Sequence, residues 1–190
     1  MTIPKTAPAL VAMFLAAALG GCGGGAVPLT FDLAALPATG RAGTSARAFS
    51  VAEPVGIQPF EADRIIVREP GGALSFLGGG QWADRLPRLI QSLENSGRLK
   101  SVSRPGDKIV SEFQLISEIR AFDIAAGTGE AVVDISAKIV AEGTGKVVAA
   151  RIFTARVPVP KVDAGSAAVG LDAALARVLA EMVAWVNSGR

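Results

Sequence analysis

The chain contains no histidine and no tyrosine, and it has one cysteine in 190 residues. Without histidine it cannot build Ser-His or Cys-His nucleophilic pairs, it lacks the commonest general base, and most kinds of zinc site are excluded. A single cysteine, Cys22, cannot form an intramolecular disulfide. These absences leave paired carboxylates as the one ordinary route to catalysis.

Charge of one sign and long apolar runs are also scarce. The 19 basic and 17 acidic residues are interspersed, so the chain has no basic block of the kind that binds nucleic acid. After the N-terminal region, no segment approaches the roughly 18 consecutive apolar residues that a membrane-spanning helix needs. We therefore expect no nucleic-acid partner and no transmembrane helix.

The N-terminus has the organisation of a lipoprotein signal. Lys5 precedes an apolar run of about 13 residues, which suits a secretory signal and is too short to span a bilayer. Leu19, Gly20 and Gly21 then precede Cys22, and small residues directly before a cysteine form a lipobox. We expect a signal peptidase to recognise these three residues and to remove 1–21 as the signal peptide.

Cys22 is then the expected lipidation site. Its thiol can take a diacylglycerol and its freed amine a further acyl chain such as palmitate, and each buried methylene adds about 0.8 kcal/mol of anchoring. An ordinary signal peptide with an incidental cysteine is the alternative. Gly23 follows the cysteine where proteobacterial lipoproteins retained at the inner membrane tend to have aspartate. This favours the periplasmic face of the outer membrane.

The mature chain is expected to form one domain. Residues 22–30 carry the lipidated cysteine and a glycine-rich flexible tether, and residues 31–190 form a single periplasmic domain. Alternating apolar and polar side chains, bounded by Gly and Pro turns, predict strands at 31–33, 48–57 with a break at Pro54, 64–68, 73–77, 113–121, 133–139 and 146–157.

Two amphipathic helices are predicted beside these strands. Apolar residues from Trp82 to Leu93 recur with helical spacing over 82–95, after a glycine loop at 78–80. Asp163 can cap a last helix with a broad apolar stripe. One apolar face on each helix and one on the sheet predict an α+β fold, an antiparallel β-sheet with both helices packed on one face in a two-layer sandwich.

A few residues are candidates for chemistry or for contact. The acid pairs nearest in sequence are Glu61 with Asp63 and Glu112 with Glu118, and solvated strand charges explain the second pair equally well. We expect no metal site. The residues that can contact a partner or lipid are Trp82, Trp185, Arg64 and Arg68, although tryptophans at such positions more often lie in the core.

At these residues the chain resembles the ABC-type transport auxiliary lipoproteins. One difference is the first helix, which is about two turns shorter than the family usually has. The matching segments follow the family's order along most of the mature chain: FDL at 31–33, DRIIVR at 63–68, QWADRLP at 81–87, FQL at 113–115, IRAF at 119–122, GKVVAARIF at 145–153 and AWV at 184–186.

The resemblance implies a non-enzymatic periplasmic subunit without cofactors. Its implied partners are an MCE-type substrate-binding protein and ABC permease subunits, in a system that moves phospholipids or other hydrophobic molecules between membranes. A homo-oligomer is compatible with this interpretation. Two alternatives remain open: a direct periplasmic carrier that holds an acyl chain in its core, and a carboxylate-dependent periplasmic hydrolase.

Overall fold

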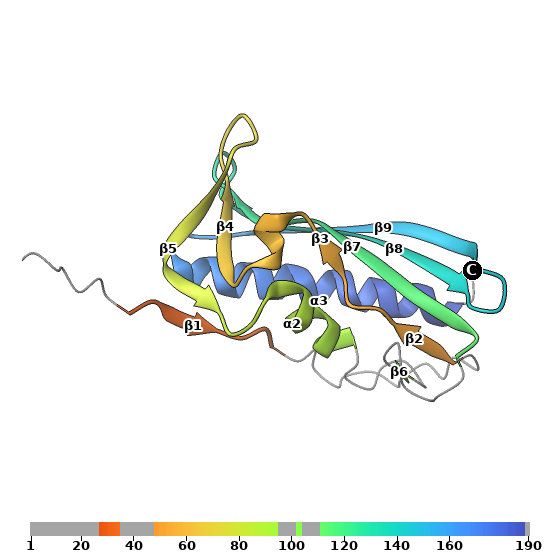
Figure 1. Cartoon of the computed structure of the whole chain (residues 1–190). Helices are drawn as coiled ribbons and strands as arrows, with labels where there is room; N and C mark the ends of the chain where they lie inside the picture. Colours follow the sequence, from red (N-terminus) through yellow and green to blue (C-terminus); the bar gives the residue numbers. More distant parts are fainter. Residues whose placement is uncertain (1–26, 35–47, 95–101, 104–110, 189–190) are drawn as a thin grey trace, which may run out of the picture.

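Three long strands that follow one another in the chain form the centre of the sheet. In the computed structural model, which describes residues 27–34, 48–94, 102–103 and 111–188, β7 (Phe113–Ala125), β8 (Glu130–Ala141) and β9 (Lys146–Pro158) pair as an antiparallel meander (Figure 1). The three strands predicted over these segments are confirmed, and alternation is clearest in β8. The side chains on one face of β8 are all buried: Ala131, Val133, Ile135, Ala137 and Ile139.

Three short strands pair in succession with the other edge of β7. β2 (Phe49–Val51), β3 (Val55–Gly56) and β4 (Arg64–Arg68) lie parallel to its beginning, middle and end. Pro54 lies between the first two strands, as expected for a residue that cannot donate to a ladder. The 3-10 helix η1 (Gln58–Glu61) separates the second from the third.

Three further strands complete the sheet. The sheet is mixed, which corrects the prediction of a purely antiparallel one. β5 (Leu74–Trp82) pairs antiparallel with β4, whereas β1 (Leu29–Phe31) is parallel to β5 and β6 (Val102–Ser103) is parallel to β2. The parallel partners lie far apart in the chain. Alternation within a strand shows which face is buried but not the direction of the neighbouring strand.

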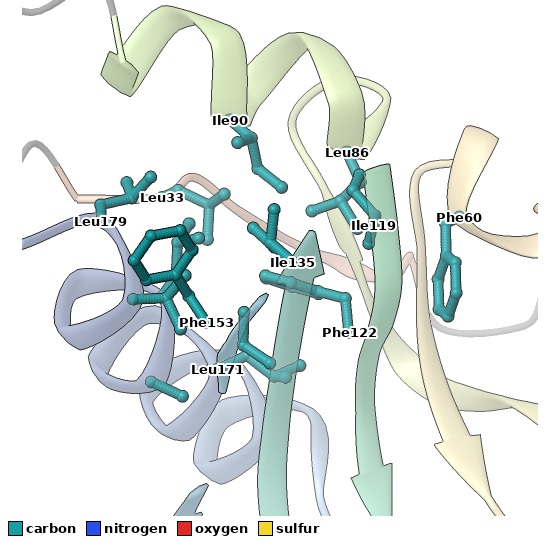
Figure 2. Packing of buried hydrophobic residues seen from close by; sticks show 14 of the residues in the cluster. Leu33, Phe60, Leu86, Ile90, Ile119, Phe122, Ile135, Phe153, Leu171 and Leu179 are labelled. Atoms are coloured by element: carbon teal, nitrogen blue, oxygen red, sulfur yellow. The ribbon is translucent and has the colours of Figure 1, made fainter. Parts of the chain in front are cut away.

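The long helix covers one face of the sheet, and the short helix adds side chains to the same core. α2 (Leu86–Glu94) and α3 (Ala164–Ser188) contribute to the same core, where Leu86 and Leu171 gather around Ile135 of β8 (Figure 2). The predicted α+β class is therefore confirmed. The apolar stripe predicted for the last helix is buried, with Val183 half-buried at its edge: Leu171, Ala174, Leu175, Val178, Leu179, Met182 and Val186.

The first helix begins later than predicted. β5 runs through the three glycines at 78–80 as far as Trp82, so these glycines lie in a strand and not in the expected loop. α2 starts at Leu86, with Pro87 in its first turn, where a missing N–H costs no helical hydrogen bond. Trp82 and Leu86 are both buried, so a strand-to-helix junction produced the apolar spacing of a longer helix.

Candidate functional site

Both tryptophans lie in the core and not on the surface. Trp82 is 2% exposed, and its ring packs edge-on against Phe122 with centroids 5.7 Å apart. Trp185 is 8% exposed and packs in the same manner on Phe153 at 5.5 Å. The structure thus gives the two indoles a packing role and leaves neither as an exposed contact.

The two candidate arginines have different environments. Arg64 is exposed, and its guanidinium lies 5.0 Å from the ring centre of the exposed Phe76, in cation–π geometry. Arg68 makes a bidentate ion pair with Asp123, with Nη2 2.6 Å from Oδ2. Asp123 is 1% exposed, so Arg68 is committed to neutralising a buried carboxylate.

Further ion pairs extend across the face of the sheet that the two helices leave open. Arg120 Nε lies 3.3 Å from Asp134 Oδ1, and the Thr154 hydroxyl donates to the same carboxylate at 2.8 Å. Arg156 Nη1 lies 3.3 Å from Glu130 Oε2. Most of these side chains line a polar hollow of about 310 Å³. Each of these arginines has a carboxylate partner, so none of them supplies an unpaired cation for a free anion.

The described contacts do not bring either candidate carboxylate pair together. Glu112 and Glu118 are six residues apart along extended chain, which separates them by roughly 20 Å, whereas paired catalytic carboxylates lie within about 10 Å. Glu61 is engaged with Arg85, whose Nη1 lies 3.4 Å from Glu61 Oε2. Among the described residues, no hydrogen bond joins Asp63 to Glu61. The structure therefore offers no support for either pair as catalytic machinery.

The described ranges hold neither a metal-binding cluster nor a membrane-crossing helix. No group of three or more Asp, Glu, Cys or His side chains within them is placed to hold a metal ion. None of the helices they contain has the length and apolar content needed to traverse a bilayer. Cys22 and the residues Leu19, Gly20 and Gly21 lie outside the described residues, so lipidation stays a prediction.

The first strand after the expected tether is an edge strand that pairs with β5, and α3 packs against β5 near this junction. Leu29 of β1 pairs with Gly80 of β5. A Cβ atom at position 80 would lie 2.6 Å from Cβ of Ala164 and 2.7 Å from the ring of Phe31. Glycine is therefore required for β1, β5 and the first turn of α3 to meet.

Two aspartates of this region have pKa values displaced in opposite directions. Asp163 accepts a hydrogen bond from the Ser166 N–H at 2.8 Å, and this confirmed helix cap lowers its pKa. Asp172 accepts from the Ala34 N–H at 2.8 Å, which ties the chain after β1 to α3. Burial, with the nearby charge of Asp32, raises the pKa of Asp172 despite that hydrogen bond.

An apolar hollow of about 370 Å³ lies between the end of β9 and the first turns of α3. Val157, Val159, Pro160 and Val169 contribute to its lining. Gly170 lets the helix approach, because a Cβ there would overlap Val159. Sequence reasoning missed this site. The sequence signal that could have indicated it was Val169, because this apolar residue lies outside the apolar stripe predicted for the last helix.

Family comparison identifies the chain. The model of the ABC-type transport auxiliary lipoprotein component matches residues 25–183. The chain belongs to this family. An accessory role for a lipoprotein in ABC-type transport is the description that family membership carries.

Relatives of this auxiliary lipoprotein agree in fold. A solved protein from Xanthomonas campestris is 26% identical and superposes with a TM-score of 0.73, covering 86% of this chain and 95% of that one. A second, uncharacterised crystal structure shares the fold at 12% identity and a TM-score of 0.66, covering 84% of this chain and 99% of that one. An uncharacterised protein of Bradyrhizobium diazoefficiens is 31% identical over 175 residues. That match includes 87% of this chain but only 46% of the curated relative, so the chain spans about half the relative's length.

Proposed function

We propose that this chain is a lipid-anchored, non-enzymatic auxiliary subunit of an ABC-type transporter that moves phospholipids or other hydrophobic molecules between the two membranes of the envelope. The observation that carries the proposal is the family match, which begins at residue 25, three residues after the lipobox cysteine Cys22. Signal, lipidation site and family domain thus follow one another in the order that such a subunit requires.

The proposed anchor is a diacylglycerol and an N-acyl chain on Cys22. Gly23 stands at the position where aspartate would favour inner-membrane retention. The domain would therefore face the periplasm from the outer membrane. Two or three acyl chains suffice for durable attachment, since one chain alone gives only marginal binding.

A non-enzymatic role agrees with the chemistry of the described residues. The chain has no histidine. Glu112 and Glu118 are too far apart to cooperate, and the arginines of the open sheet face are matched by carboxylates. Such a surface suits contact with another protein, and the proposed partners are an MCE-type substrate-binding protein and ABC permease subunits. Self-association into a homo-oligomer is a further part of the proposal.

Affinity capture tests this proposal. The full-length lipidated protein would be isolated from membranes in mild detergent, and its proteins and lipids identified by mass spectrometry. The Cys22→Ala variant serves as the unanchored control. Co-purification of an MCE-type protein and permease subunits, with lipid at background, is the expected result.

A direct lipid carrier is the second candidate. The apolar hollow of about 370 Å³ lies within the size range of small-molecule sites and favours this reading. A stoichiometric lipid recovered without transporter subunits would replace the auxiliary role with the carrier role. Recovery of neither lipid nor subunits would contradict both.

A further inference from the structure

Several exposed apolar side chains lie at the end of the domain where the chain leads to the expected anchor. This end, formed by residues 27–31 and 157–173, is here named the tether end. Val169 is 71% exposed and Val162 45% exposed, beside the apolar hollow. Val27 and Leu29 are exposed as well. The start of β1 and the start of α3 lie at this end, and the C-terminus lies at the opposite end (Figure 1).

The covalent tether limits how far this end can lie from the membrane. Cys22 and Leu29 are seven residues apart, which at full extension span at most about 25 Å. α3 has 25 residues and is therefore about 37 Å long. The tether is shorter than the domain, so the bilayer that holds the anchor stays close to the tether end.

We propose that the tether end rests on the lipid surface, with Val162 and Val169 in contact with the interfacial region of the bilayer. This inference rests on the proposed lipidation of Cys22. The occupant of the apolar surface is the membrane itself, because a short tether makes the contact intramolecular and gives it a high effective concentration. Apolar side chains that are weak membrane ligands alone then remain bound.

The charges at the tether end fit an apolar contact, because its ranges hold one basic residue, Lys161, against Asp163 and Asp172. Asp163 is turned toward the N–H of Ser166, and the partly buried Asp172 accepts the N–H of Ala34. An electrostatic contact would need a surplus of basic residues facing anionic lipid. The contact is therefore expected to survive high salt, which screens exposed charges.

Site-specific fluorescence tests the inference on the full-length lipidated protein. Because Cys22 is the only natural cysteine and its thiol is consumed by the lipid, Val169→Cys supplies a single free thiol for an NBD probe. Val147→Cys is the matched control, since Val147 is 57% exposed and lies at the other end of β9. Each labelled protein is reconstituted in phosphatidylethanolamine–phosphatidylglycerol vesicles with and without nitroxide-labelled lipid.

The expected result is a blue-shifted NBD emission at position 169, quenched by the nitroxide lipids and unchanged by salt, with a water-like, weakly quenched signal at position 147. A blue shift at 169 without lipid quenching would mean that protein covers the site, and it would overturn the inference. Equal signals at both positions would overturn it too. The intact mass of the protein shows whether Cys22 carries acyl chains, and so distinguishes a missing membrane contact from a missing anchor. Acyl chains on Cys22 with a water-exposed probe at 169 refute this contact alone, whereas a Cys22 without acyl chains removes the anchor as well.

Discussion

Asp172 is a residue at which ionisation works against folding. Burial and the charge of Asp32 raise its pKa, so the folded protein binds this proton more tightly than the unfolded chain does. The stabilising contribution of the protonated form is complete at low pH and is lost as the pH rises through the folded-state pKa. Above that value the charged carboxylate is a net cost.

Asp172→Asn should therefore raise the free energy of unfolding at neutral pH. The amide oxygen can still accept the Ala34 N–H, and the charge is removed. Near pH 3, where an ordinary aspartate is mostly protonated, the difference should vanish. Urea unfolding at the two pH values measures this. A variant less stable than the wild type at neutral pH would contradict it.

Glu142 shows the opposite behaviour. The hydroxyls of Ser111 and Ser50 donate to its Oε1 at 2.7 and 2.6 Å and lower its pKa. A lowered pKa gives stability that is present above the unfolded-state value and is lost as the pH falls through the folded-state value. Glu142→Gln should be less stable than the wild type at neutral pH, and the gap should shrink below about pH 4.

The control for Glu142 is Glu118→Gln, an exposed glutamate on β7. Both variants would be compared by urea unfolding across the acid range. A gap for Glu142→Gln that stays constant with pH would show that the hydrogen bonds do not depend on its charge.

Arg68→Met should be strongly destabilising. It leaves the buried carboxylate of Asp123 without its cation, and breaking a buried pair in this way costs about 3 kcal/mol or more. Arg156→Met is the matched control. Arg156 and its partner Glu130 are more exposed, so its loss should cost less than about 1 kcal/mol. Similar midpoints of chemical unfolding for the two variants would argue against the special role of the Arg68 pair.

Sequence reasoning reached only one side of that pair. Arg68 was recognisable as a charged residue in a short strand. Its partner Asp123 is 55 residues away and lies beyond the end of the strand predicted over 113–121. Asp123 is buried on the open face because β4 pairs with β7 beside it, and no local sequence pattern reveals that pairing.

At the scale of secondary-structure elements, the junction of β1, β5 and α3 depends on Gly80. Gly80→Ala would force a Cβ against Ala164 and Phe31, and overpacking of this kind costs about 1–3 kcal/mol. Gly78→Ala is the control, because no atom lies within 4 Å of the position of its Cβ. Thermal unfolding should show a lower midpoint for Gly80→Ala and little change for Gly78→Ala. Equal midpoints would mean that α3 or β1 shifts at no cost.

Elements with a long, regular pattern could be predicted from the sequence, and so could β4, whose bounds match the predicted 64–68. The strand β6 was missed, and β1 begins earlier than the strand expected at 31–33. β7, β8, β9 and α3 have enough residues for their periodicity to be plain. β6 has two residues, and β1 has three, so pairing with distant strands decides their conformation. The boundary at Trp82 was missed because strand and helix bury their side chains in one core.

At the scale of the whole molecule, the layered arrangement was predictable because two helices and a sheet with one apolar face each leave few ways to bury all three. Two surfaces, the apolar hollow and the charged open face of the sheet, could not be predicted. The hollow at the tether end and the ion pairs of the open face are assembled from residues of several elements. Their positions follow from the topology and not from any one segment.

The pairing of β1 with β5 has a mechanical consequence. In the proposed anchored state, tension carried by the tether enters the domain through β1. β1 is hydrogen-bonded along its length to β5, so a pull along the strand shears these bonds together instead of peeling them one by one. The Ala34–Asp172 hydrogen bond resists at the trailing end of the same segment. Under tension, β1 should detach from β5 before the β7–β9 meander unfolds. The anchored segment would then extend while the rest of the domain stays folded.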